Sequence, residues 1–327
     1  MSDSTPPQPA ERSGSKFERG AVLALLCAQI GILFTGAVVR VTGSGLGCVT
    51  WPNCQPGSLI TVAGAQPWIH QAIEFGNRML TFVLVAVAIA AFVAVVQHKR
   101  RKPLILHAIA QGVGIIVQAV IGGISVHLDL QWWSVALHFL PSSILVWLAA
   151  IFYIRVSEPD DGTPTPQYPR PLRLLAIGSA LAMAVVLITG TMTTGAGPHA
   201  GDSKAGMQGR LNVSIAEMAH VHAHFMYLFL GLSIGLVVAL VTVRASRPAL
   251  RHGGWLLGII VVQGAIGILQ YRFGVPRWTV PVHVVLSGVV TAFAGFVYAY
   301  GSRRELSAKA QANLIHGDAP RAAAASA

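Results

Sequence analysis

Charged residues are scarce in this chain of 327 residues. Asp, Glu, Lys and Arg together make up 11% of the sequence, whereas 54% of the residues are hydrophobic. A soluble domain carries about 25% charged residues, so the composition excludes an ordinary soluble protein and indicates a membrane protein. The apolar stretches also lack the alternation of polar and apolar residues that a membrane β-barrel needs, which excludes a closed barrel.

Eight stretches are long and apolar enough to cross a bilayer as helices, which takes about 20 residues each. They lie at about 21–40, 69–96, 104–126, 132–153, 172–193, 215–243, 255–271 and 278–300. We therefore predict an all-α polytopic membrane protein. Its eight transmembrane helices are expected to form two pseudo-symmetric four-helix bundles, of the kind that often holds cofactors between facing helices.

The predicted domain boundaries follow from these stretches. Residues 1–20 and 303–327 are polar or Ala-rich and are expected to be disordered cytoplasmic ends. Residues 21–156 form the first bundle and residues 172–302 the second. The segment 157–171 between them is rich in Pro and Asp, as expected of a cytoplasmic linker.

The net charge of +11 is unevenly distributed. Basic residues collect at the N-terminus, in every second loop and at the C-terminus, and the alternate loops are poorer in Lys and Arg. By the positive-inside rule, both termini face the cytoplasm of a multi-pass protein of the bacterial cell (inner) membrane. Because the basic residues set this topology, we expect the lipid bilayer, and not nucleic acid, as the partner of the charged surface.

The sequence contains an internal duplication that places histidines at matching positions. The stretch from Val117 to Gly122 recurs from Val262 to Gly267, and the alignment continues without a gap to His138 and His283. With the same offset, His222 corresponds to Asn77. Four helices per half cross the membrane an even number of times, so the repeat is parallel and differs from the inverted repeats of many transporters.

These four polar residues lie at one depth, roughly 8–12 Å inside the outer boundary at 1.5 Å per residue. Ionisable groups inside a bilayer are costly and are functional candidates by default. His222 and His283 could bind one iron from opposite sides, and a two-histidine haem suits electron transfer. A lone buried histidine is more often a hydrogen-bonded core residue, but three at repeat-equivalent positions favour ligation.

The two halves differ at one further pair of positions. Glu74 shares a helix face with Asn77, and Arg78 follows at i+4, whereas the second half has Ala219 and Ala223 there. A carboxyl group in an apolar helix can move protons. We therefore predict chemistry in the first pocket and electron relay in the second. The alternative is an intrahelical Glu74–Arg78 ion pair that only satisfies itself.

The three cysteines occupy two environments. Cys27 lies in the first apolar stretch and is predicted to be a small core residue. Cys48 and Cys54 share the first external loop. That side is oxidising in bacteria, so a disulfide is permitted there. Two cysteines alone make a poor zinc site.

Taken in order, several motifs resemble the haem A synthase family of bacterial and mitochondrial membranes. The resemblance covers nearly the whole span from about residue 20 to 300. Its motifs are Thr42-Gly43-Ser44-Gly45-Leu46 with Cys48 and Cys54, His70-Gln71 leading to Glu74 and Asn77-Arg78, Gly122-Gly123 leading to His138, Gly195 to His199, and then His222 and His283.

The resemblance implies an oxidoreductase that converts the C8 methyl group of haem O, through hydroxylated intermediates, to the formyl group of haem A for terminal cytochrome oxidases. It implies substrate haem in the first bundle and a haem b cofactor in the second. The residues carried over are His222 and His283 as haem b ligands, His138 as ligand of the haem O iron, Glu74 as the catalytic acidic residue, Asn77 and Arg78 on the substrate side, and Cys48 and Cys54 as a disulfide. The farnesyltransferase that makes haem O is an expected partner, and an electron donor of unknown identity is implied.

Two positions depart from the family pattern. Asn77 stands where the family has a second substrate-side histidine, which leaves the iron five-coordinate through His138 in one reading. The second-half loop from Gly197 to Asp202 has no cysteine, so a second disulfide cannot form. The main alternative is a di-haem cytochrome b-like electron carrier with no haem substrate, which gives Glu74 no purpose. A transporter is disfavoured because the polar residues cluster near one surface.

Overall fold

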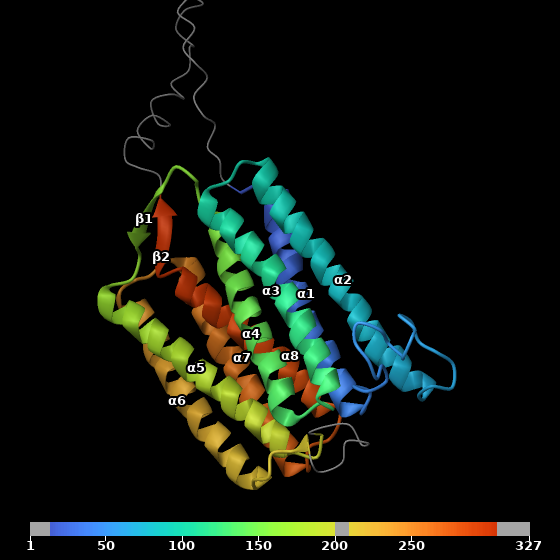
Figure 1. Ribbon diagram of the computed structural model, residues 1–327. Coiled ribbons are helices and arrows are strands. Elements are labelled where there is room, and N and C mark those ends of the chain that lie inside the picture. Colours follow the sequence, from blue (N-terminus) through green and yellow to red (C-terminus); the bar gives the residue numbers. More distant parts are fainter. Residues whose placement is uncertain (1–13, 200–208, 306–327) are drawn as a thin grey trace, which may run out of the picture.

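The computed structural model describes residues 14–199 and 209–305 (Figure 1). The predictions for residues 1–13 and 306–327, and part of the prediction for the loop from Gly197 to Asp202, lie outside the described residues. Within these ranges the regular structure is helical apart from one short two-stranded ribbon.

The described residues contain eight helices that are long and apolar enough to cross a membrane. This confirms the predicted all-α polytopic class. In chain order the helices are α1 (Lys16–Val41), α2 (Trp68–Gln97), α3 (Lys102–His127), α4 (Trp132–Arg155), α5 (Arg170–Ala196), α6 (Ile215–Thr242), α7 (Arg247–Arg272) and α8 (Thr279–Ala299).

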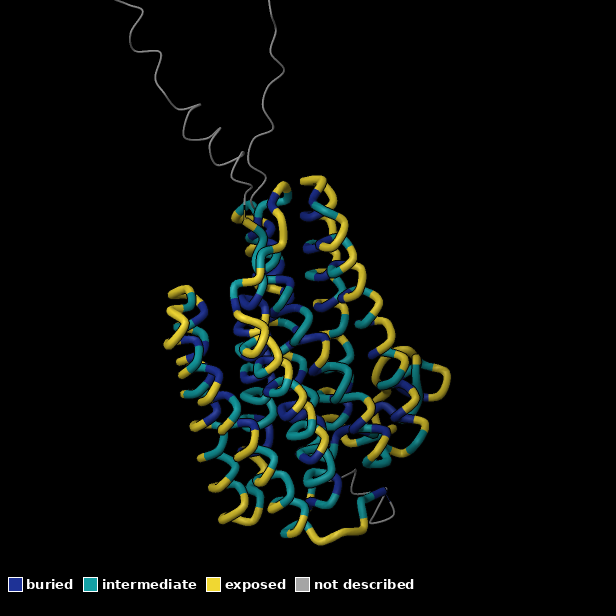
Figure 2. Tube along the Cα trace, turned by 90° about the vertical axis from the view of Figure 1, so that its left-hand side faces the viewer, coloured by how far each residue is buried: buried dark blue, intermediate teal, exposed yellow. Residues whose placement is uncertain are grey.

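The helices contact one another as two rings of four. In the first half α1 contacts α2 and α4, and α3 contacts α2 and α4; in the second half α5, α6, α7 and α8 repeat this arrangement. The halves meet where α8 packs against α1 and α4, and where α4 contacts α5. Figure 2 shows exposed residues along the outer faces of the helices. Apolar side chains on those faces are expected for helices that contact lipid.

The start of α1 lies earlier than the sequence analysis predicts. Ser15 and Glu18 form a capping box, in which each side chain accepts a hydrogen bond from the other residue's backbone N–H. Residues 16–20 therefore belong to the helix and not to the polar terminus. Cys27, predicted to be a core residue, is exposed on α1. The residue lies on the outer face of the helix. Lipid-facing and core-facing positions are both apolar, so the sequence does not distinguish between them.

The linker between the halves is tied into the structure. Strand β1 (Thr163–Pro166) pairs antiparallel with β2 (Ser302–Glu305), so the described part of the predicted C-terminal tail begins as a strand. The fully buried carboxylate of Glu158 pairs with Arg101 at 2.9 Å, Arg155 at 2.8 Å and Arg303 at 3.2 Å. We call the end of the molecule that carries β1, β2 and these arginines the basic end.

A second set of ion pairs extends the same network to α1. Arg100 lies 3.1 Å from Glu18 and 2.8 Å from Asp160, and its Nη2 donates to the backbone carbonyls of Val156 and Glu158. The network thus joins the beginning of α1, the α2–α3 connection, the linker and β2. It fixes the basic end of the first half against the second.

Candidate functional site

The second half brings two of the predicted ligands together. The ring centroids of His222 on α6 and His283 on α8 are 6.4 Å apart. A metal–imidazole nitrogen bond of about 2 Å and a ring radius of about 1 Å on each side give a separation of about 6 Å for two rings on one metal. In the described part of the chain, no group of three or more His, Cys, Asp or Glu residues could hold a metal ion. Two imidazoles therefore suit a metal whose other ligands come from a porphyrin.

A backbone carbonyl and a side-chain hydroxyl of α5 orient the ring of His222. Its Nδ1 lies 3.0 Å from the carbonyl oxygen of Val186 and 3.3 Å from the hydroxyl of Thr189. When Nδ1 carries the proton and donates to that carbonyl, Nε2 is left as the ligand atom. Histidines that bind metals usually have their second ring nitrogen held in this way.

Two glutamines at repeat-equivalent positions bind the backbone of the other two histidines. Gln118 on α3 donates from Nε2 to the carbonyl oxygen of His138 at 2.7 Å. Gln263 on α7 makes the same bond to the carbonyl oxygen of His283 at 2.9 Å. The duplication therefore preserves the hydrogen bond to the backbone of each histidine as well as the histidine itself.

Glycines on the neighbouring helices leave room for these imidazole rings. A Cβ atom at Gly122 would lie 3.0 Å from Cε1 of His138, and one at Gly267 would lie 3.2 Å from Cε1 of His283. Both distances are shorter than ordinary van der Waals contact between carbon atoms. The two glycines occupy equivalent places in the repeat, so a larger residue at either would displace the ring.

Several buried polar atoms at this site have no hydrogen-bond partner among the described residues. They are Nδ1 of His138, Nδ1 of His283, Oδ1 of Asn77 and the Oε1 atoms of Gln118 and Gln263. Buried polar atoms are normally satisfied, and exceptions call for an explanation such as a bound group. No hydrogen bond joins Asn77 to His138 within the described residues. Unpaired polar atoms of this kind occur in both halves, as expected of two sites that each hold a bound group.

The predicted acidic residue is buried and paired. Glu74 on α2 accepts a hydrogen bond at Oε1 from Nε of Arg78 at 3.0 Å. The alternative of an intrahelical ion pair predicts this contact. Among the described residues no hydrogen bond reaches Oε2. That oxygen is the part of the carboxyl group that remains available for chemistry.

Arg78 also holds the loop that follows α1. Its Nη1 donates to the carbonyl oxygens of Thr50 at 2.9 Å and Asn53 at 3.1 Å, and its Nη2 donates to that of Cys48 at 3.2 Å. All three acceptors lie in the segment closed by the Cys48–Cys54 disulfide, which the structure contains. One guanidinium therefore connects Glu74 to the disulfide loop.

The disulfide loop covers the end of the first half that is opposite the basic end (Figure 1). The indole ring of Trp51 lies directly against Gly123 on α3, and Nε2 of His127 lies 3.1 Å from the carbonyl oxygen of Trp51. Gln71 at the start of α2 bonds to the backbone of Val62 and Gln66. The loop is thus fixed above Glu74 and His138 by contacts from two helices.

With this geometry established, comparison with known proteins decides the family. The model of the COX15-CtaA family, described as cytochrome oxidase assembly protein, matches residues 20–294. The chain belongs to this family. The match spans both halves and includes every predicted site residue.

Curated relatives named heme A synthase match over shorter stretches. A heme A synthase of Geobacillus kaustophilus is 33% identical over 23% of this chain and 22% of its own length. A heme A synthase of Exiguobacterium sibiricum is 29% identical over 49% of this chain and 53% of the relative. One of Bacillus licheniformis is 27% identical over 54% and 58%. The chain therefore aligns with less than two thirds of the length of each of these relatives.

Some members of the site are not assigned a role by the sequence analysis. Gln118 and Gln263 lie inside the duplicated stretch, yet a glutamine in an apolar helix does not reveal which backbone group it binds. Their recurrence at one offset is the signal that could have identified them. Thr189 and the carbonyl of Val186 have no such signal, because the first half has Asn77 in place of an imidazole.

Proposed function

We propose that this COX15-CtaA family member is a haem A synthase, which oxidises the C8 methyl group of haem O to a formyl group through hydroxylated intermediates. The observation that carries the proposal is the asymmetry of two repeat-related sites. Each half supports an imidazole with a glutamine and a glycine. Within the described residues, only the first half adds a buried carboxyl group to this set, at Glu74.

The second half is the proposed cofactor site. His222 and His283 would hold haem b between α6 and α8, since the spacing of their rings suits two ligands of one iron. Bound there, haem b supplies one-electron transfer. The protein's own contribution is to position the two histidines. The carbonyl oxygen of Val186 holds the ring of His222, and Gln263 donates to the backbone carbonyl of His283.

The first half is the proposed substrate site. His138 would bind the iron of haem O, and Asn77, whose amide is a poor iron ligand, would leave that iron open to oxygen or another oxidant, which takes up the electrons that the methyl group loses. Glu74 would accept or relay a proton at Oε2 close to the methyl group that is oxidised. Arg78 holds the other oxygen of the carboxyl group, so that Oε2 stays in one place. The disulfide loop would exclude water from this side.

The proposed setting follows from the charge pattern. The basic end would face the cytoplasm of a bacterial cell membrane, with the disulfide loop on the outer side. Haem O would be the substrate, and the farnesyltransferase that makes it and an electron donor would be the partners of the reaction.

The test is to coexpress the full chain with a source of haem O and to identify the extracted porphyrins by mass and absorption. We expect a formyl-bearing product from the wild type. Glu74→Gln should lower its yield by about 10²–10⁴-fold, the usual contribution of a general acid or base, while haem b stays bound. Glu217→Gln, an exposed carboxylate on α6, is the matched control. A wild-type protein that binds haem b but forms no formyl product would support the electron carrier instead.

A further inference from the structure

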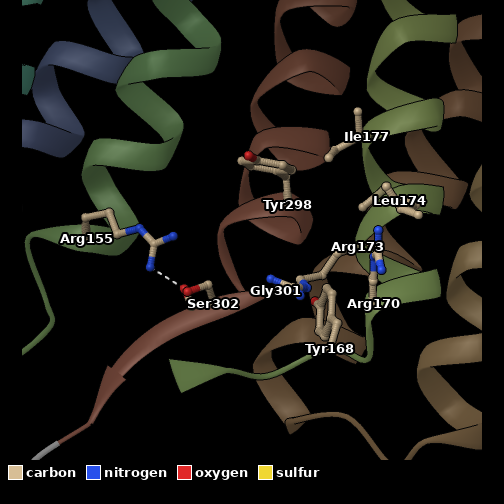
Figure 3. Close-up of a pocket in the computed structure, with 10 residues that line it drawn as sticks. Arg155, Tyr168, Arg170, Arg173, Leu174, Ile177, Tyr298, Gly301 and Ser302 are labelled. Carbon is tan, nitrogen blue, oxygen red and sulfur yellow. Dashed lines mark hydrogen bonds between the residues drawn. The ribbon is translucent and has the colours of Figure 1, made fainter. Parts of the chain in front are cut away.

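A pocket of about 300 Å³ opens at the basic end, away from the histidines. It lies where the linker enters α5 and where α8 leaves for β2, and its wall includes Tyr168, Gly301 and Tyr298 (Figure 3). Nothing in the proposed haem chemistry uses it. The pocket is therefore separate from the proposed haem sites.

The lining of the pocket is cationic. It contains Arg155, Arg170 and Arg173 and no Asp or Glu. The positive charge of Arg155 is balanced by Glu158, which lies behind the pocket wall at 2.8 Å. Within the described residues, neither Arg170 nor Arg173 has a hydrogen bond or ion pair from its side chain. Two uncompensated guanidinium groups thus stand at one pocket, whereas Arg155 in the same lining is paired.

The same pocket has an apolar side. Leu174 and Ile177 lie on α5 within two turns of the arginines and also line the pocket, and in Figure 3 they lie on the side of the pocket away from Tyr168 and β1. They are 58% and 42% exposed, as expected of side chains that face lipid. The pocket therefore changes from cationic to apolar along α5, at the level where this helix enters its apolar stretch.

The wall that Tyr168, Gly301 and Ser302 contribute is held in place by hydrogen bonds. The hydroxyl of Tyr168 donates to the carbonyl oxygen of Val297 at 3.0 Å, and the backbone N–H of Tyr168 donates to the carbonyl oxygen of Gly301. Arg155 also donates to the carbonyl oxygen of Ser302 (Figure 3). The β1–β2 ribbon continues these contacts. The pocket is a built feature of the fold, since four segments of the chain are fixed around it.

We propose that this pocket binds the phosphate group of an anionic phospholipid. Arg170 and Arg173 would bind the phosphate oxygens, to which guanidinium groups are suited in geometry and charge. An acyl chain would follow Leu174 and Ile177 along α5. Basic pockets at the cytoplasmic ends of transmembrane helices recognise anionic head groups in this way. The inference is independent of the proposed function, because it uses no residue of the haem sites.

The test is native mass spectrometry of the full chain in detergent, titrated with phosphatidylglycerol, with phosphatidylcholine and with inorganic phosphate. We expect saturable binding of phosphatidylglycerol, and much weaker binding of the zwitterionic lipid. The double variant Arg170→Gln/Arg173→Gln should lose about 30-fold in affinity, since each basic residue near a head group contributes about a factor of five. Arg170→Lys/Arg173→Lys, which keeps the charge, should retain most of the binding.

The control variant is Arg244→Gln/Arg247→Gln, which removes two exposed arginines from the α6–α7 connection at the same end of the bundle. It should bind phosphatidylglycerol like the wild type. An equal loss of affinity in both double variants would show that the lipid is attracted to the basic end in general. That result would contradict the proposed binding at the pocket. Unchanged binding in Arg170→Gln/Arg173→Gln would overturn it as well, as would inorganic phosphate that displaces the lipid at equal concentration. All four arginines are exposed, so folding should be retained, and thermal unfolding of each variant checks this.

Discussion

The imidazole rings of His222 on α6 and His283 on α8 lie with their centroids 6.4 Å apart and their planes inclined by 64°. The ring of His222 is held by the carbonyl oxygen of Val186, and the backbone carbonyl of His283 accepts a hydrogen bond from Gln263. Two basic side chains kept this close in an apolar region would be unfavourable without a shared ligand. The relationship is the geometric basis of the proposed haem b site.

The first prediction follows directly from this pair. His222→Ala or His283→Ala should each abolish the low-spin haem absorption of the purified protein, with a loss of haem affinity of more than about 100-fold, since even the partners that orient a ligand contribute 10–100-fold. His220→Ala is the control, because this exposed residue on the same helix contacts the ring of Tyr271. If either ligand variant keeps the wild-type spectrum, the assignment of that histidine is wrong.

The second prediction concerns the space beside the ring of His283. Gly267→Val should displace the ring, because a Cβ atom there already lies 3.2 Å from its Cε1, and haem b affinity should fall by about 10-fold or more. Gly264→Val is a matched control on the same helix, one turn away, where a Cβ atom would meet only the flexible end of Met226 at 3.8 Å. Haem content per protein, measured by absorption, compares the two. Equal losses of haem in the two variants would mean that valine disturbs helix α7 itself and does not act through the ring of His283.

The third prediction concerns the asymmetry at Asn77. Asn77→His would give the first half the second imidazole that the other half has, so the purified protein should gain low-spin haem absorption. Formation of the formyl product should fall, because the open face of the substrate iron is closed. Asn77→Ala serves as the control and should leave the spectrum of the wild type. A histidine variant with unchanged spectrum and full turnover would show that Asn77 does not face the substrate.

The sequence predicts the helices well because the bilayer sets their length. Each apolar stretch matches one of α1 to α8, and most ends differ by three residues or fewer, but α7 begins eight residues earlier than predicted. The beginning of α1 is missed because its capping box, Ser15 and Glu18, lies among polar residues. The β1–β2 ribbon is missed because its strands have four residues each and are far apart in the chain. Short strands with that separation have no periodic signal.

Only part of the candidate site can be predicted from the sequence. The duplication relates His138 to His283 and His222 to Asn77, since it compares positions in the chain. It does not reveal that Arg78 binds the disulfide loop, because the three acceptors are backbone carbonyls and carry no residue-specific signal. The exposure of Cys27 is missed for a related reason. A lipid-facing and a core-facing position have the same apolar character.

The last prediction concerns stability and the carboxylate of Glu158. This group is fully buried between Arg101, Arg155 and Arg303. Burial lowers the pKa of the Arg101 guanidinium, and the charges of Glu158 and Asp160 oppose that shift. Glu158→Gln would leave the arginines without their shared counter-charge, and breaking a buried ion pair from one side costs about 3–5 kcal/mol.

We therefore expect Glu158→Gln to unfold at a clearly lower temperature than the wild type when both are heated in the same detergent. Glu217→Gln removes an exposed carboxylate on α6 and should change the free energy of unfolding by less than about 0.5 kcal/mol. Because the network joins the linker to β2, the loss should be partly recovered when Arg303→Gln is added to Glu158→Gln, which removes one uncompensated charge. Equal unfolding temperatures for Glu158→Gln and Glu217→Gln would show that the buried pairs at the basic end contribute little, since their attraction then only offsets the cost of removing the charges from water.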